Sequence, residues 1–251
     1  MSHFTIGLVS FVGIFGGALL GLLAARRLPG HHLGSETQTA VTVSVAVIGT
    51  LAALVLGLMI TAANGSFTKR SEEVRELSLQ LIRMDRNLKR YGPEADDARY
   101  KLHIWATTKI QQLFPEKGKV VSTSDQTIEL LEGVQDAVME LKPNDARQEH
   151  LRTLCLTLSS TMIQARWGLE THAGHSIPIP FLVLLIFWLA IVFASFGLFA
   201  PPNPTTMVAL FLCALAVAGG IFLIEDLDNP GAGFVRLPMD AMEKALTEIN
   251  R

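Results

Sequence analysis

The feature that most constrains this chain is a long stretch without any charged side chain, from Thr37 to Thr68. A helix of about 20 apolar residues crosses the hydrocarbon core of a bilayer, so this stretch can span a membrane with residues to spare. Beyond Asn64 the chain turns polar, but its apolar residues keep a helical period. The sequence therefore predicts one helix that begins as a membrane span and continues into a polar domain.

The rest of the chain holds three more apolar segments of spanning length: Phe4–Ala25, Phe181–Phe199 and Thr206–Ile224. With 49% hydrophobic residues and a mean hydropathy of +0.37, the chain is too apolar for an ordinary soluble protein. The first segment does not resemble a secretory signal, because its positive charges, Arg26 and Arg27, follow the apolar core instead of preceding it. We therefore predict four membrane spans.

The polar region between the second and third spans has helical periodicity and no strand-like alternation. Two long apolar stripes step by three and four, over Val74, Leu77, Leu81, Met84, Leu88 and Tyr91, and over Leu151, Leu154, Leu158, Met162, Ala165 and Leu169. Two shorter amphipathic helices lie between these stripes. We expect the first stripe to be buried against the second stripe or against a neighbouring subunit.

These patterns together predict an all-α polytopic membrane protein with a helical extramembrane domain. Residues 1–63 would hold spans one and two, residues 64–176 the helical domain, and residues 177–224 spans three and four. Residues 225–251 would form a tail with a short helix. Positive residues near the spans favour the cytoplasm, and most of them flank the helical domain and the tail, which places both termini and that domain inside. Arg26 and Arg27 argue for the opposite orientation.

Several functional classes are disfavoured by what the sequence lacks. The net charge of -2 gives no sign of nucleic-acid binding. No G-x-S-x-G, H-E-x-x-H, C-x-x-C or Walker A motif occurs, and no span carries an ionisable residue of the kind that proton pumps use. Two distant cysteines do not make a disulfide framework. We therefore expect neither an enzyme nor a coupled transporter.

Two spans carry small residues on one helical face, which lets helix backbones approach closely in lipid. These residues are Gly13, Gly17 and Gly21 in the first span, and Gly49, Ala53 and Gly57 in the second. The second span also has a candidate pore-lining face of Thr50, Leu54, Thr61 and Asn64. Hydroxyls and an amide solvate ions, and a ring of leucines can close a pore by dewetting. Alternatively, the threonine hydroxyls bond back to their own helix and the face only packs.

Acidic residues gather after the fourth span, where Glu225, Asp226 and Asp228 precede a Pro-Gly turn. Carboxylates at a flexible bend are ligands that calcium accepts, although the spacing is not that of a calcium loop. Two alternatives are open: solvated caps that end the span, or a structural tie in which Asp228 pairs with a basic residue such as Arg70. His172 and His175 stand three apart before the third span, a weak metal-site pattern against ordinary solvated histidines.

The order of two spans, a helical domain, two spans and an acidic Pro-Gly segment resembles the bestrophin-like family of bacterial membrane proteins. The resemblance is carried by Trp188, Ser195–Pro201 and Asn203, by Gly220–Ile224 with Leu227, Asp228, Pro230 and Gly233, and by Ser66–Arg90 with Arg70 and Glu73. It implies a homo-oligomer around a shared axis in the bacterial plasma membrane, by analogy with the bestrophin anion channels, which are calcium-responsive pentamers. The phenylalanine-rich constriction of bestrophins is missing from the second span here.

Two functions of different classes follow from these observations. The first is a homo-oligomeric ion channel for inorganic anions, with the second span lining the pore. The second is a non-conducting membrane scaffold or stress sensor that binds a partner through its helical domain. Conductance of the reconstituted protein distinguishes the two.

Overall fold

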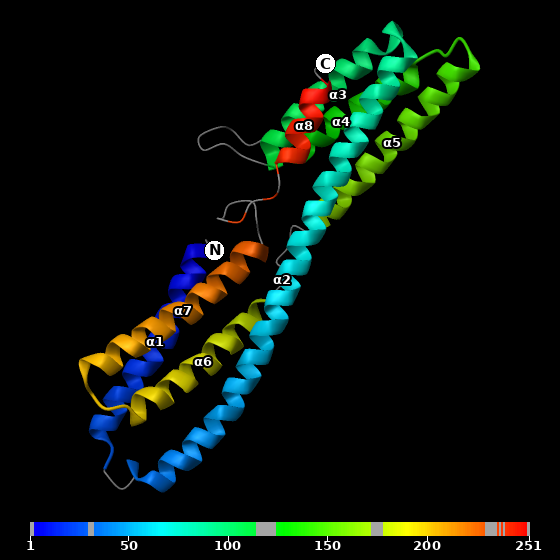
Figure 1. Cartoon of the computed structure of the whole chain (residues 1–251). Helices are drawn as coiled ribbons and strands as arrows, with labels where there is room; N and C mark the ends of the chain where they lie inside the picture. Colours follow the sequence, from blue (N-terminus) through cyan, green and yellow to red (C-terminus); the bar gives the residue numbers. More distant parts are fainter. Residues whose placement is uncertain are drawn as a thin grey trace. The chain divides into compact units, whose positions relative to one another are not determined.

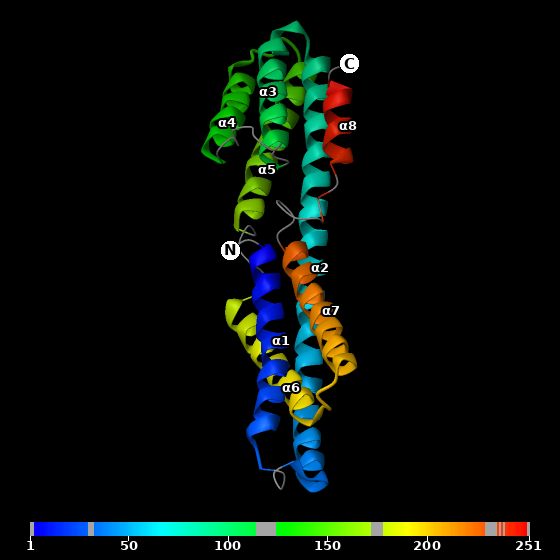
Figure 2. The same ribbon diagram turned by 90° about the vertical axis from the view of Figure 1, so that its left-hand side faces the viewer.

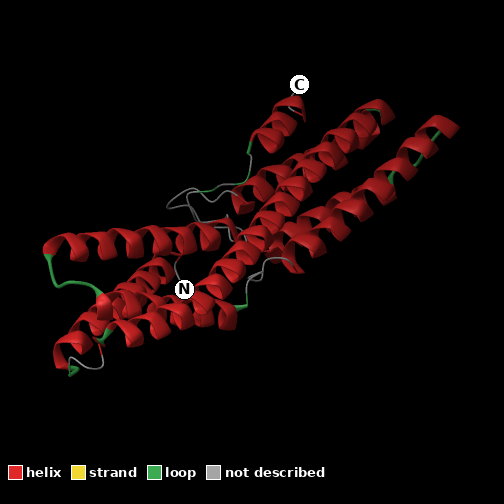
Figure 3. Cartoon of the chain, turned by 60° about the horizontal axis from the view of Figure 1, so that its bottom comes forward, coloured by secondary structure: helices red, strands yellow, loops and turns green. Residues whose placement is uncertain are grey.

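The computed structural model of the protein describes residues 3–29, 33–113, 124–171, 178–228, 235, 237 and 239–249, and every regular element in these residues is a helix (Figure 3). Figure 1 shows their order along the chain. The helices are α1 (His3–Arg27), α2 (Ser35–Tyr91), the 3-10 helix η2 (Pro93–Ala95), α3 (Asp96–Leu113), α4 (Ser124–Glu140), α5 (Ala146–Thr171), α6 (Ile179–Phe199), α7 (Pro204–Asp228) and α8 (Asp240–Ile249).

Four of these helices, α1, α2, α6 and α7, are long and apolar enough to cross a membrane. This confirms the predicted all-α class and the four candidate spans. The helix α2 runs through 57 residues without a break, from the uncharged stretch into the polar region. No proline interrupts it, and the prediction that one helix serves both regions is confirmed.

The chain divides into two compact units. The first, which we call the span unit, comprises residues 1–67 and 175–235, and the second, the bundle unit, comprises residues 68–174 and 236–251. The span unit holds α1, the N-terminal part of α2, α6 and α7. The bundle unit holds the C-terminal part of α2 together with α3, α4, α5 and α8.

The contact between α1 and α6 is made by glycines that bring the two backbones together (Figure 2). A Cβ atom on Gly17 would lie 2.5 Å from the carbonyl oxygen of Ala190, and one on Gly21 would overlap the carbonyl oxygen of Ala194. From the other side, Gly197 of α6 abuts the α1 backbone in the same way. The predicted close-packing role of the first span's glycine face is therefore confirmed, with α6 as its partner.

Aromatic rings connect α1 to α7 on another side of α1. The ring of Phe211 meets those of Phe11 and Phe15 edge-to-face, at centroid distances of 5.4 and 5.6 Å. Edge-to-face pairs at this separation are favourable beyond the area they bury. The helix α1 is therefore held between α6, through backbone proximity, and α7, through large side chains.

The bundle unit has a continuous apolar core that contains the first predicted stripe. Val74, Leu77, Leu81 and Leu88 are all buried, as predicted, and the last three share one cluster with residues of α3, α4, α5 and α8. On α5 the buried positions include Leu151, Cys155 and Met162. The other side chains of that cluster are Met84, Tyr91, Ala95, Ala98, Leu102, Trp105, Ala106, Leu131, Val134, Ala137, Val138, Leu141, Met242, Ala245 and Ile249.

One position of the second predicted stripe is wrong. Leu154 is 38% exposed, and its neighbour Cys155 takes the core position with 1% exposure. From Leu151 the helix returns to the same face after 3.6 residues, so residues 154 and 155 are alternative positions, and Cys155 is the one that joins the bundle core. The side chains of Ala165 and Leu169 lie outside the described residues.

Burial makes Cys155 a core side chain and not a reactive thiol. The loss of solvent around it raises its pKa from 9.0 to about 12. Because the folded pKa lies above the unfolded one, this thiol contributes stability that is fully present below pH 9 and is lost as the pH rises toward 12. At neutral pH its thiolate fraction is negligible.

The C-terminal helix α8 completes the bundle core, where the sequence predicted only a tail with a short helix. Met242, Ala245 and Ile249 are buried in the same cluster as the α2 stripe. The buried hydroxyl of Ser78, which donates to the carbonyl oxygen of Val74 at 2.8 Å, lies 3.4 Å from the Met242 sulfur. The last turns of the chain are therefore part of the bundle and not an appendage.

We predict that Gly21→Ala destabilises the protein while Gly16→Ala does not. The added methyl group at position 21 would overlap the α6 backbone, whereas one at position 16 would meet no atom within 4 Å. Overpacking of this kind costs about 1–3 kcal/mol, against a gain of up to about 1 kcal/mol from replacing glycine in a helix. Thermal unfolding in detergent measures both variants, and equal melting temperatures for the two would contradict the close contact.

Candidate functional site

The candidate pore-lining face of α2 is exposed along its whole length. Thr50, Leu54, Thr61 and Asn64 are all exposed, Leu54 at 61%. The side of α2 that packs into the span unit carries Ala52, Met59 and Ala63 instead, which are buried. In an α-helix of 3.6 residues per turn, residues separated by two positions, such as 50 and 52, lie on nearly opposite sides. The face through residues 50, 54 and 61 therefore points away from the rest of its own unit.

The threonine hydroxyls on this face bond to their own helix. Thr50 donates to the carbonyl oxygen of Ala46 and Thr61 to that of Gly57, each at 2.9 Å. This is the back-bonding that the sequence analysis gave as the alternative to ion solvation. The hydroxyl protons are used in these bonds, but the oxygen lone pairs remain on an exposed surface, where they can accept hydrogen bonds from water.

The small residues of α2 form an open surface next to this face. A Cβ atom added to Gly49 or Gly57 would meet no atom within 4 Å, and Ala53 is exposed. The first span uses its glycines against α6, so the two small faces differ although their sequences look alike. Contact of Gly49, Ala53 and Gly57 with another helix remains a prediction, and within the described chain no helix fills that place.

The second span is the least covered of the four by its own chain. Only 11% of its most apolar window is buried, against 33% for α1, 28% for α6 and 22% for α7. A span that contacts only lipid has no need for hydroxyls, an amide and a run of small residues on its open side. This contrast makes the open side of α2 the best candidate for contact with water or with other copies of the chain.

The acidic residues at the end of α7 are buried. Glu225, Asp226 and Asp228 are 3%, 0% and 1% exposed, so the alternative of solvated caps is wrong. Asp226 accepts a hydrogen bond from the backbone N–H of Val235 at 2.8 Å, which ties the chain beyond α7 back to the helix end. Buried carboxylates need such partners, because an uncompensated charge away from water is costly.

A metal site is not apparent in the part of the chain that the structure describes. No three His, Cys, Asp or Glu side chains there are grouped so that they could hold an ion. Asn229, which follows the acidic residues, lies outside the described residues, as do His172 and His175. The proposed calcium ligands Glu225, Asp226 and Asp228 therefore remain a prediction.

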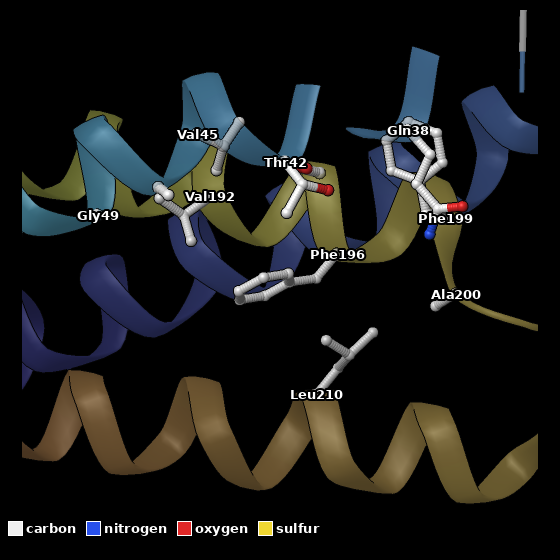
Figure 4. Close-up of a pocket in the computed structure, with 11 residues that line it drawn as sticks. Gln38, Thr42, Val45, Gly49, Val192, Phe196, Phe199, Ala200 and Leu210 are labelled. Carbon is white, nitrogen blue, oxygen red and sulfur yellow. The ribbon is translucent and has the colours of Figure 1, made fainter. Parts of the chain in front are cut away.

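The sequence patterns did not indicate a pocket that lies between α2, α6 and α7. It has a volume of about 410 Å³, and Figure 4 draws its lining residues and labels most of them. Thr42 and Gln38 reach it from α2, Phe196 from α6 and Leu210 from α7. Four of its lining residues, Ser195, Phe196, Phe199 and Ala200, lie in the stretch on which the family resemblance rests, but their spacing alone gives no sign of a cavity.

Comparison with protein families decides the classification, since the model described as the Bestrophin-like domain matches residues 12–242. The chain belongs to the Bestrophin-like family. Among solved structures it is similar to the crystal structure of a mutated bacterial bestrophin homolog from Klebsiella pneumoniae. The two chains share 16% sequence identity and a TM-score of 0.66 over 100% of each, which shows a common fold. No curated protein matches the sequence.

For this Bestrophin-like protein we predict that Asp228→Asn lowers the melting temperature equally with calcium and with a chelator. Loss of charge from a buried carboxylate weakens its hydrogen bonds and ion pairs, which lowers the free energy of unfolding by about 1–3 kcal/mol. The matched control is Asp136→Asn on α4, where the side chain is exposed and the change should be neutral. A melting temperature that rises with calcium in the wild type but not in Asp228→Asn would contradict the structural tie and favour a calcium site.

Proposed function

We propose that this protein is a homo-oligomeric ion channel in which α2 of each copy lines a shared pore. The observation that supports this proposal most is the exposed side of α2, the least buried span. The side chains on it, facing away from the other spans of its unit, are Thr50, Leu54, Thr61 and Asn64. Membership of the Bestrophin-like family supports the same function, by analogy with the bestrophin channels.

The two open surfaces of α2 suit a ring of helices. In such a ring each helix has a side toward the axis and a flank toward the next copy. The surface of Gly49, Ala53 and Gly57 begins beside the pore-lining face and overlaps it at Gly57, so Gly49 and Ala53 can contact the next copy while the pore-lining side chains face the axis. A five-membered ring is favoured by analogy with bestrophins.

The order of side chains along α2 gives this pore a constriction. Leu54 lies between Thr50 on one side and Thr61 and Asn64 on the other, so an apolar ring would separate two hydrophilic rings. An apolar constriction closes a pore by excluding water, and the flanking polar rings keep water in place on either side. Leu54 would therefore set the barrier to conduction.

Anion selectivity is the part of this proposal that rests on the family. The threonine hydroxyl protons are committed to carbonyl oxygens of α2, which leaves the amide of Asn64 as the donor that can face an anion. The protein would work in a bacterial plasma membrane with its bundle unit and termini in the cytoplasm, as the charge distribution predicts. Its chemistry would be conduction and not catalysis.

We predict that Leu54→Ala raises ion flux through the reconstituted protein severalfold. Truncation of the leucine widens and wets the constriction, which lowers the barrier to ions. The control is Leu20→Ala on α1, which removes the same atoms from a leucine that is 67% exposed on another span. Single-channel recording in planar bilayers, with chloride and then gluconate as the anion, measures conductance and selectivity. Absence of any current from correctly assembled protein would favour the non-conducting scaffold instead.

We further predict that Gly57→Leu disrupts the oligomer. Leucine is the better helix former by roughly 1 kcal/mol, so a loss of assembly would come from its bulk at a helix contact. Gly16→Leu on α1, where the added side chain also starts in open space, serves as the control. Size-exclusion chromatography with light scattering in detergent gives the subunit number. If Gly57→Leu assembles as the wild type does, this surface faces lipid or a wide pore.

A further inference from the structure

A second pocket adjoins the one in Figure 4 at the end of the span unit where α1 and α6 finish. It measures about 390 Å³ and shares Gln38, Phe199 and Ala200 with the first. We call the pocket of Figure 4 the inner pocket and this one the outer pocket. The outer pocket is completed by Leu22, Ala25, Arg26, Leu33, Leu198, Pro201 and Pro202.

The two pockets differ in chemistry. The inner pocket is lined chiefly by apolar side chains from three helices, among them Val192, Phe196 and Leu210, with Thr42 and Ser195 as its minor polar groups. The outer pocket has one cation, Arg26, among its lining residues. The two neighbouring pockets are therefore mostly apolar, and the outer one adds a positive charge.

The place of Arg26 on its helix fits the surface of a bilayer. It is the penultimate residue of α1, at the point where that candidate span ends, and it is exposed. A guanidinium at this level matches a phosphate in charge and in its paired donor geometry. The amide of Gln38, which lines both pockets, supplies a further donor between the apolar and the charged parts.

We propose that the joined pockets bind one anionic phospholipid, with an acyl chain in the inner pocket and the headgroup phosphate beside Arg26. Each volume lies within the usual range of ligand pockets, roughly 300–1,000 Å³. A side chain from a second copy would fill the apolar part without using the Arg26 cation, so the charge favours a lipid over a subunit contact.

This assignment also accounts for a charge that the predicted orientation leaves unexplained. Arg26 and Arg27 lie at the C-terminal end of α1, the end that the other positive residues would place outside the cytoplasm. A role in holding a headgroup gives Arg26 a reason to be there that does not depend on topology. The lipid site does not include Leu54, so it can be tested apart from conduction, although Gly49 of the proposed helix contact also lines the inner pocket.

The test is native mass spectrometry of the full-length protein with palmitoyl-oleoyl phosphatidylglycerol or phosphatidylcholine added in detergent. Arg26→Gln should weaken phosphatidylglycerol binding about fivefold, the effect of about 1 kcal/mol for one basic residue at an anionic surface. It should weaken phosphatidylcholine binding less, because the choline of that zwitterionic lipid already neutralises the phosphate that Arg26 would contact. Arg27→Gln, the neighbouring exposed arginine that does not line either pocket, should change neither. Equal losses in the two arginine variants would overturn the proposal, since general surface charge would then explain binding.

A second pair of variants tests the acyl-chain part. Val192→Phe should fill the inner pocket and lower binding of both lipids, whereas Val183→Phe, on the exposed side of α6, should leave binding unchanged. Val192→Phe that retains wild-type lipid binding would overturn the proposal. Excess inorganic phosphate should not displace phosphatidylglycerol, and displacement would identify a soluble-anion site instead. Wild-type melting temperatures in lipid-free detergent confirm that the variants are folded.

Discussion

The span unit depends on the absence of side chains between α1 and α6. Lipid tails are as apolar as leucine, so helices in a membrane gain little from burying apolar surface against each other, and close backbone packing must supply the attraction. Gly17 and Gly21 from one helix and Gly197 from the other allow this approach. The helix α1 packs against α6 and contacts α7 through Phe211, so these three spans pack together. The fourth span, α2, buries only one side against them.

The two glycine-rich helices show what a small face in a sequence means and what it leaves open. Gly13, Gly17 and Gly21 meet α6. Gly49 and Gly57 lie at a similar helical spacing, yet a Cβ atom added to either would meet no atom within 4 Å among the residues that the structure describes. A face of small residues indicates that another helix can approach this one closely. It does not indicate which helix, because the partner depends on the packing of the whole unit and, in an assembly, on another copy of the chain.

Most of the fold could be predicted from periodicity, because apolar length and helical spacing are local properties of the chain. The spans, the unbroken α2 and the buried stripe of Val74, Leu77, Leu81 and Leu88 follow from them. What could not be predicted depends on three-dimensional neighbours. The bundle core encloses Cys155 and leaves Leu154 exposed. Asp226 and Asp228 are enclosed although acids at a span's end are usually solvated, and Arg26 lines a pocket with residues some 170 positions later in the chain.

The position of α8 in the bundle core has a consequence for how the protein is made. The core of the bundle unit is built mainly from residues before 172, yet Met242, Ala245 and Ile249 also belong to it. A ribosome adds these residues only after both α6 and α7 have been synthesised. Until then the α2 stripe lacks part of its cover and exposes apolar surface, the condition in which chains aggregate or recruit chaperones. Completion of the bundle is therefore a late step in biogenesis, and a chain that stops short of α8 has an unfinished core.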